Sequence, residues 1–161
     1  MSEETIVADM MQRAVALAQQ GMDGNHGGPF GAVIADGTKV VGQGFNRVLE
    51  TNDPTAHAEV LAIRDACQSL NSFSLQGLTL YSSCEPCPMC LAAAYWARLD
   101  AVYFANTRSD AARIGFDDAA IYAEVKRAPE LRKELPTIHF PCPTAATAFE
   151  NWQAKADRTD Y

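Results

Sequence analysis

The sequence predicts an α/β fold, a three-layer α/β/α sandwich with a mixed central sheet. Two observations support this class: short β-type runs alternate with segments of helical periodicity, and no repeat or linker interrupts the chain. The 161 residues suffice for one substantial core, and 48% of them are hydrophobic. We therefore expect one domain over residues 1–161, in which residues 137–161 form a C-terminal extension.

The first half of the chain contains a helix, a hairpin and a second helix. Apolar residues at helical spacing predict a helix over residues 5–20, with Gly21 as its end. Residues 32–35 and 39–45 are β-type runs on either side of a glycine-containing turn, which is typical of a hairpin. A second helix is expected over residues 56–70, after capping residues and a proline at positions 52–55.

The second half continues the alternation. A strand over residues 78–82 precedes a helix that we expect to open at Pro86 and to run through Ala97, and residues 101–105 form a buried strand. The elements expected beyond this point are a helix over 121–125 capped by Asp117 or Asp118, an edge strand over 137–140 and a last helix over 145–156.

Charge and composition exclude several classes of protein. Thirteen Lys and Arg stand against 20 Asp and Glu, and the net charge of −7 makes nucleic acid an unlikely partner because phosphate contacts need clustered basic residues. No segment approaches the ~20 apolar residues of a membrane helix. The acidic start, Met1–Glu4, lacks the features of a signal peptide, so we expect a cytoplasmic protein without membrane contact. Five cysteines in a reducing compartment indicate metal or thiol chemistry rather than disulfides.

Two short motifs carry metal-binding chemistry. Cys87 and Cys90 lie three positions apart near a helix start, so that their thiolates face one way, and His57 can supply a third ligand from another helix. Three protein ligands leave the fourth position of a tetrahedral zinc to water or hydroxide, which is typical of a catalytic site. Cys84 is the candidate for a fourth ligand of a structural zinc, but it precedes Pro86 and is expected to end a strand.

Glu59 is the candidate proton carrier of this site. A separation of two residues turns its side chain ~200° away from that of His57 in a regular helix. The two side chains converge only if the site lies beyond the helix tip, where free backbone N–H groups, including that of Ala58, also face it. A carboxylate there can move protons for a water molecule activated by zinc.

The pairing of H-x-E with P-C-x-x-C is the signature of zinc-dependent nucleobase deaminases. The chain most resembles the bacterial guanine deaminases of cytidine deaminase-like fold, and the resemblance covers nearly all of it. The matching segments are Gly28–Val33, Asn52–Val60, Ser83–Cys90, Tyr95–Arg98 and Gly115–Asp118. The resemblance implies hydrolytic deamination of guanine to xanthine and ammonia, with zinc on His57, Cys87 and Cys90 and with Glu59 as the proton shuttle.

The resemblance also implies roles in substrate binding. Asp118 would contact the base and assist the leaving amine, although a capping role for it stays open. The other residues implied to line the pocket are Phe30, Asn46, Trp96 and the C-terminal Tyr161. The resemblance further implies a homodimer, for which a domain swap of the C-terminal segment is one arrangement.

Two alternatives stay open. A deaminase of the same fold could act on guanosine, cytosine or tRNA adenosine, although the acidic net charge disfavours RNA. A non-catalytic zinc module would use the metal only for folding, and it would have no need of Glu59 because this residue is not required as a ligand.

Overall fold

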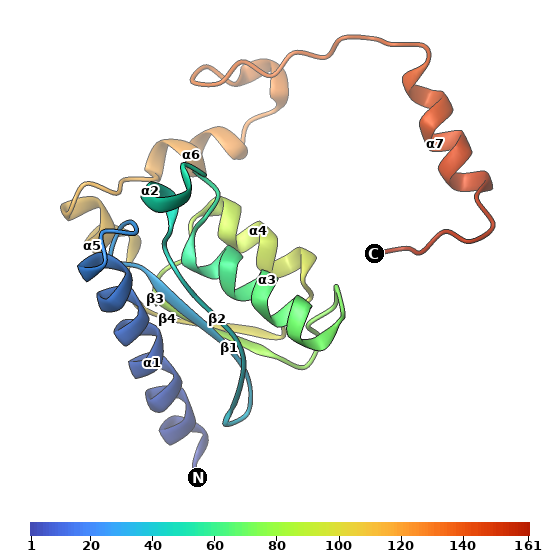
Figure 1. The fold of residues 1–161 in the computed structure, drawn as a ribbon. Coiled ribbons are helices and arrows are strands. Elements are labelled where there is room, and N and C mark those ends of the chain that lie inside the picture. The colour runs from blue at the N-terminus through green and yellow to red at the C-terminus, as the bar shows by residue number, and fades with distance from the viewer. The chain divides into compact units, whose positions relative to one another are not determined.

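The computed structural model describes residues 1–161 and contains one four-stranded sheet in the order β2-β1-β3-β4 (Figure 1). Strand β1 pairs antiparallel with β2 and with β3, whereas β3 and β4 run parallel, so the sheet is mixed as predicted. The strands are β1 (Gly31–Asp36), β2 (Lys39–Phe45), β3 (Thr79–Cys84) and β4 (Ala101–Asn106).

Helices cover both faces of this sheet, which confirms the predicted sandwich (Figure 1). Helix α1 (Glu3–Asp23) packs on one face, and helices α3 (Ala58–Leu70) and α4 (Pro88–Trp96) lie on the other. Side chains alternate along each strand, so neighbouring residues enter different cores. The core below α3 and α4 includes Ala32, Ile34, Leu80, Ala58, Ala62 and Ala66. The core below α1 includes Met10, Ala14, Val33, Ala35 and Tyr81.

Helix α3 lies unusually close to β2, and this closeness sets the position of its N-terminus. A Cβ atom at Gly42 would be 2.5 Å from the carbonyl oxygen of Ala62, and one at Gly44 would be 2.7 Å from that of Ala58. Because both strand residues lack a side chain, the helix rests directly on the strand backbone. The first turn of α3 is thereby held against the sheet.

Several predicted helix boundaries were wrong, and three of the differences have a clear physical reason. Helix α1 continues past Gly21 because this glycine packs against Phe45, whose ring would be 2.7 Å from an added Cβ. Helix α4 begins at Pro88 rather than Pro86, since a proline disfavours helical backbone in the residue before it and Cys87 is extended. Residues 53–56 form a turn in which Asp53 accepts hydrogen bonds from Thr55, so α3 begins only after His57.

The contacts between residues within the chain divide it into two compact units, Met1–Ala119 and Ala120–Tyr161. The first unit also contains two short helices that sequence periodicity had not separated from loops, α2 (Val48–Thr51) and α5 (Arg108–Arg113). No helix in either unit has the length and the apolar character that a bilayer crossing requires.

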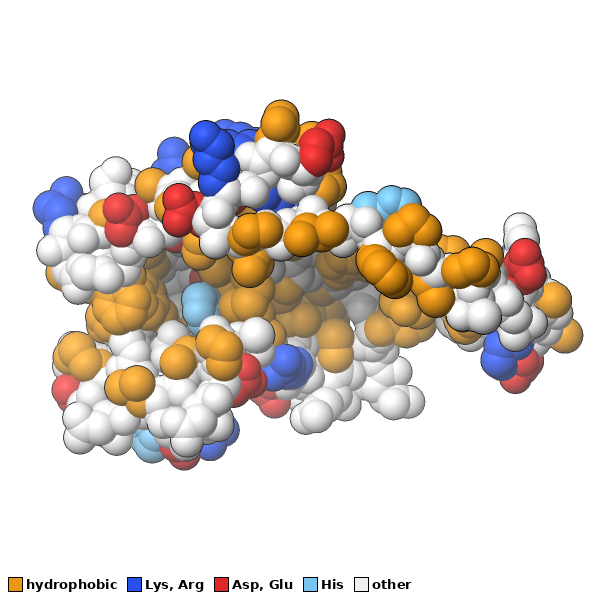
Figure 2. Space-filling model, turned by 90° about the horizontal axis from the view of Figure 1, so that it is seen from above, with side chains coloured by type: hydrophobic (Ala, Val, Ile, Leu, Met, Phe, Trp, Pro, Cys, Tyr) orange, Lys and Arg blue, Asp and Glu red, His pale blue; other side chains and the backbone are white.

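The second unit contains little regular structure. Its elements are α6 (Ala119–Val125, which begins at the boundary), the 3-10 turn η1 (Pro129–Leu131) and α7 (Ala145–Ala154). The predicted edge strand over residues 137–140 is absent, because this stretch has no neighbouring strand with which to pair. Apolar side chains of this unit lie at the surface, as the right side of Figure 2 shows.

Candidate active site

The three predicted zinc ligands come together at the N-termini of α3 and α4. His57 and Cys87 are the N-cap residues of these helices and have extended backbone, and Cys90 follows in the first turn of α4. The thiol sulfurs lie 3.5 Å apart, and His57 Nδ1 lies 3.6 Å from Cys87 Sγ and 3.4 Å from Cys90 Sγ. Their three potential ligand atoms all lie within 4.8 Å of one another.

These distances fit a zinc ion. Tetrahedral bonds of about 2.3 Å to sulfur and about 2.05 Å to nitrogen place two sulfurs about 3.8 Å apart, and sulfur about 3.6 Å from nitrogen. The observed separations of 3.4–3.6 Å approach these values. One nitrogen and two sulfurs are also a donor set that binds zinc in preference to magnesium or calcium.

Hydrogen bonds within the cluster separate the pKa values of its two thiols. A hydrogen bond from the thiol of Cys90, together with a hydrogen bond from His57, lowers the pKa of Cys87 to about 4. The same contact, together with burial, raises the pKa of Cys90, and the bond to Cys87 raises the pKa of His57. Cys87 therefore supplies a thiolate, the form of cysteine that binds metal, at neutral pH.

Glu59 lies beside this cluster in the first turn of α3 and is 6% exposed. Burial raises the pKa of its carboxyl group, to which Cys90 is also hydrogen-bonded. The hydroxyl of Ser82, on β3, lies 3.3 Å from Glu59 Oε1. A buried carboxyl with a raised pKa accepts a proton more readily than an exposed one.

Ser82 was missed from the sequence, although a signal for it exists. Leu80 and Ser82 point to the same face of β3 because side chains alternate, and Leu80 belongs to the core below α3. A hydroxyl group at such a position needs a buried hydrogen-bond partner. Period-two patterning could therefore have marked Ser82 as unusual.

Asn46 and Phe30 lie next to each other where β1 begins and β2 ends. The backbone N–H of Asn46 donates to the carbonyl of Phe30 at 2.9 Å, and its side-chain Oδ1 accepts from the N–H of Val48 at 3.1 Å. The amide NH₂ of this buried asparagine is therefore the group left for a ligand. The ring of Phe30 meets that of Phe116 edge to face, with ring centroids 4.9 Å apart.

The two acids in the segment after α5 have different surroundings. Asp117 accepts a hydrogen bond from the N–H of Ala119 at 2.9 Å and so takes the local capping role. Burial raises the pKa of half-buried Asp118, and the negative charge of Cys87 raises it further. Asp118 is thus within the electrostatic reach of the ligand cluster.

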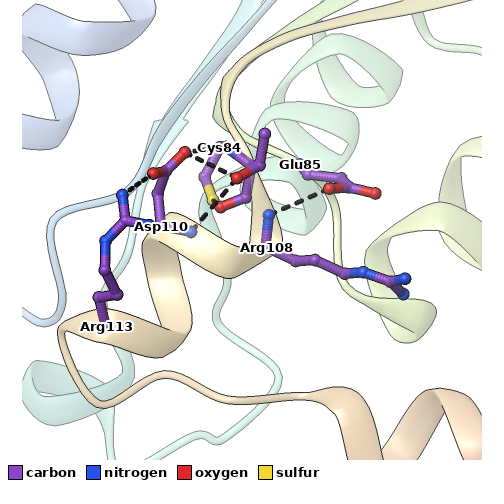
Figure 3. Close-up of polar contacts among 6 residues, drawn as sticks. Cys84, Glu85, Arg108, Asp110 and Arg113 are labelled. Carbon is purple, nitrogen blue, oxygen red and sulfur yellow. Dashed lines mark hydrogen bonds and ion pairs between the residues drawn. The ribbon is translucent and has the colours of Figure 1, made fainter.

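Helix α5 anchors this segment to the cysteine motif (Figure 3). The thiol of Cys84 donates to the carbonyl of Thr107 at 3.7 Å, and Glu85 accepts from the backbone N–H of Arg108 at 3.0 Å. Burial raises the pKa of Cys84 to about 11, and its thiol is hydrogen-bonded to Thr107. Cys84 lies outside the group of possible metal ligands that His57, Cys87 and Cys90 form. Asp110 completes the anchor by capping α5 through Thr107.

The remaining predicted residues have dissimilar positions. Ala58 is fully buried in the first turn of α3, directly after His57. Trp96 ends α4, six residues beyond Cys90, and is 67% exposed. Tyr161 belongs to the second unit and is 71% exposed. The roles of these three in substrate binding stay predictions.

Comparison with known proteins identifies the family. The sequence pattern of the cytidine and deoxycytidylate deaminase zinc-binding region matches residues 5–106. The chain belongs to this deaminase family. The match contains the helix-tip residues His57, Glu59, Cys87 and Cys90.

Individual relatives of this deaminase differ in how much of the chain they match. Guanine deaminase of Bacillus subtilis is 45% identical over 94% of this chain and 96% of its own. An X-ray structure of guanine deaminase from that organism superposes with a TM-score of 0.91, at 45% identity, over 100% of this chain and 99% of the other. A tRNA-specific adenosine deaminase of Aquifex aeolicus is 45% identical over 47% of this chain and 50% of its own. Likeness to guanine deaminase thus includes the second unit.

Proposed function

We propose that this protein is a zinc-dependent hydrolase that converts guanine and water to xanthine and ammonia. The observation that carries the proposal is the meeting of the three donors, His57, Cys87 and Cys90, with buried Glu59 at two helix tips. Similarity to guanine deaminase over nearly the full length supports guanine as the substrate.

Protein groups perform the proton transfers of this reaction. His57, Cys87 and Cys90 would hold zinc, which supplies a nucleophile near neutral pH by lowering the pKa of water. Glu59 takes up the proton released from that water and delivers it to a ring nitrogen of guanine. Its raised pKa suits this exchange, because the carboxyl must both accept and give up the proton. The water oxygen bonds to the amino-bearing ring carbon, the bond from that carbon to the amino nitrogen breaks, and the amino group takes the second proton of the water and leaves as ammonia.

The substrate contacts complete the proposal. Phe30 and Trp96 would contact the faces of the planar base, and Asn46 would donate from its amide NH₂ to an acceptor on the purine edge. The backbone N–H of Ala58, in the first turn of α3, is an available donor. Asp118 would accept from the base and assist departure of the amine, which its raised pKa supports.

We also propose a homodimer in which the second unit packs on a partner subunit and brings Tyr161 to a substrate pocket. The exposed apolar side chains of residues 120–161 support this arrangement, because an isolated segment of this kind gains little from folding alone. A cytoplasmic location is supported by the five cysteines, none of which forms a disulfide.

A panel of substrates tests the function. Purified zinc-loaded protein is offered guanine, guanosine, adenine, cytosine, cytidine and tRNA, and ammonia release and product absorbance are followed. We expect ammonia and xanthine from guanine. Turnover of another member of the panel without turnover of guanine would show that guanine is not the substrate. Zinc binding without deamination of any member would favour a structural zinc module.

A further inference from the structure

Ser82 stands out as a buried polar residue with no role in the reaction described above. It is 2% exposed and lies in the middle of β3, on the face that packs below α3 and α4. Its neighbours on this face of the sheet, Ala32 and Leu80, are apolar core residues. A serine placed among them requires a specific hydrogen-bond partner.

That partner is the carboxylate of Glu59. The serine hydroxyl donates to Oε1 across 3.3 Å, and both side chains are buried, so water competes little for the contact. An ionised carboxylate only accepts hydrogen bonds, and the hydroxyl is a donor from the sheet beneath it. The contact joins the centre of β3 to the first turn of α3.

We propose that Ser82 is a positioning residue for Glu59. Its hydroxyl holds Oε1 toward β3 and leaves the second carboxylate oxygen for proton transfer at the ligand cluster. Cys90, which is also hydrogen-bonded to the carboxyl group, limits its movement from the cluster side. Ser82 thus acts through Glu59 and is not itself one of the candidate metal ligands. The kinetic test of this inference rests on the proposed function, because it measures deamination of guanine.

Ser83 provides a matched control in the same strand. Its hydroxyl is equally buried but lies on the opposite face of the sheet, where it accepts the backbone N–H of Gly31 at 3.0 Å. This contact joins two strands and involves no residue of the site. Ser82→Ala and Ser83→Ala therefore each remove one buried hydroxyl from β3, but only the first removes a partner of Glu59.

The kinetic test compares Ser82→Ala, Ser82→Thr and Ser83→Ala in the zinc-loaded enzyme. Hydrogen bonds to charged groups contribute about 1.5–3 kcal/mol, so Ser82→Ala should lower kcat by roughly ten- to a hundred-fold. Its KM for guanine and its zinc content should match those of the wild type. Ser82→Thr restores a hydroxyl and should exceed Ser82→Ala in kcat, whereas Ser83→Ala should lower Tm and leave kcat unchanged.

Equal kcat values for Ser82→Ala and Ser83→Ala would overturn the positioning role, as would loss of zinc from Ser82→Ala or failure of threonine to restore turnover. A wild-type enzyme inactive on guanine would instead refute the proposed function. Crystal structures of the zinc-loaded Ser82→Ala and Ser83→Ala variants test the positioning role of Ser82 independently of the substrate. A Glu59 carboxylate displaced only in Ser82→Ala supports the role, and an unmoved carboxylate refutes it.

Discussion

Residues 1–119 and residues 120–161 differ in how their structure is stabilised. The first unit has two apolar cores, one on each face of its sheet, and it contains every fully buried residue of the chain. The second unit has three short elements and no fully buried residue. The candidate metal ligands and Glu59 belong to the first unit, where packing restricts side-chain positions.

This difference separates two requirements of the proposed enzyme. Chemistry needs rigidly held groups, which the helix tips on the sheet provide. The second unit leaves large apolar residues such as Phe140 and Phe149 more than four-fifths exposed, which is the basis of the proposed contact with a partner subunit. Each of the following predictions tests one side of this comparison.

The largest expected effect follows Glu59→Gln, a change inside the first unit. Glutamine preserves the shape of the side chain but cannot exchange the proton, so kcat should fall by about 10²–10⁴-fold. Zinc content and Tm should remain close to those of the wild type. Steady-state kinetics with metal analysis measures both.

Glu85→Gln is the matched control for that change. The amide oxygen of glutamine can still accept the hydrogen bond from Arg108, so turnover should be nearly unaffected. Wild-type turnover in Glu59→Gln would remove this residue from the proton pathway.

Removal of residues 120–161 tests the independence of the first unit. Both apolar cores and all three candidate ligands remain in residues 1–119, so this fragment should unfold cooperatively and bind zinc. Guanine turnover should fall because the proposed contribution of Tyr161 is lost. Calorimetry, zinc analysis and kinetics follow these properties. An unfolded fragment would show that the first unit depends on the second.

A smaller effect is expected from deletion of Asp160 and Tyr161 alone. Both residues are exposed and lie beyond α7, so Tm should not change. Loss of the proposed contact with substrate should raise KM for guanine. Kinetics identical to those of the full chain would exclude Tyr161 from the pocket.

Thiol labelling compares the two units without a substrate. Cys142 is exposed, and its hydrogen bond with Thr144 lowers its pKa, so iodoacetamide should modify it first. Cys84 is buried with a pKa of about 11 and should react much more slowly than Cys142. Chelation of zinc should make Cys87, whose pKa is about 4, newly reactive. Mass spectrometry of timed samples gives the order, and rapid labelling of Cys84 would contradict the packing described for β3.

Local sequence patterns predicted the first unit well for physical reasons. β-branched runs beside a turn specify the hairpin, and helical periodicity specifies α1 and α3. Motif spacing also predicted that His57, Cys87 and Cys90 approach one another, because each belongs to a helix start. Patterns were less informative for residues 137–140, where apolar residues resemble a strand but no neighbouring strand exists.

Contacts between distant segments were harder to predict. Ser82 meets Glu59 across 23 positions of sequence, and Phe116 meets Phe30 across a far longer interval. No local sequence pattern around Ser82 or Phe116 predicts which residue it contacts. The division of roles between Asp117 and Asp118 likewise required the backbone of the turn before α6, because either acid could cap a helix from sequence alone.

Restoration of zinc to the metal-free enzyme tests the central claim most directly. Guanine hydrolysis is measured while zinc is added in steps to a known concentration of chains. We predict no hydrolysis without metal and a rate that rises linearly until one zinc is bound per chain, with no such rise in His57→Ala. Full activity before zinc is added, or an equal response in His57→Ala, would contradict a catalytic zinc at the tips of α3 and α4.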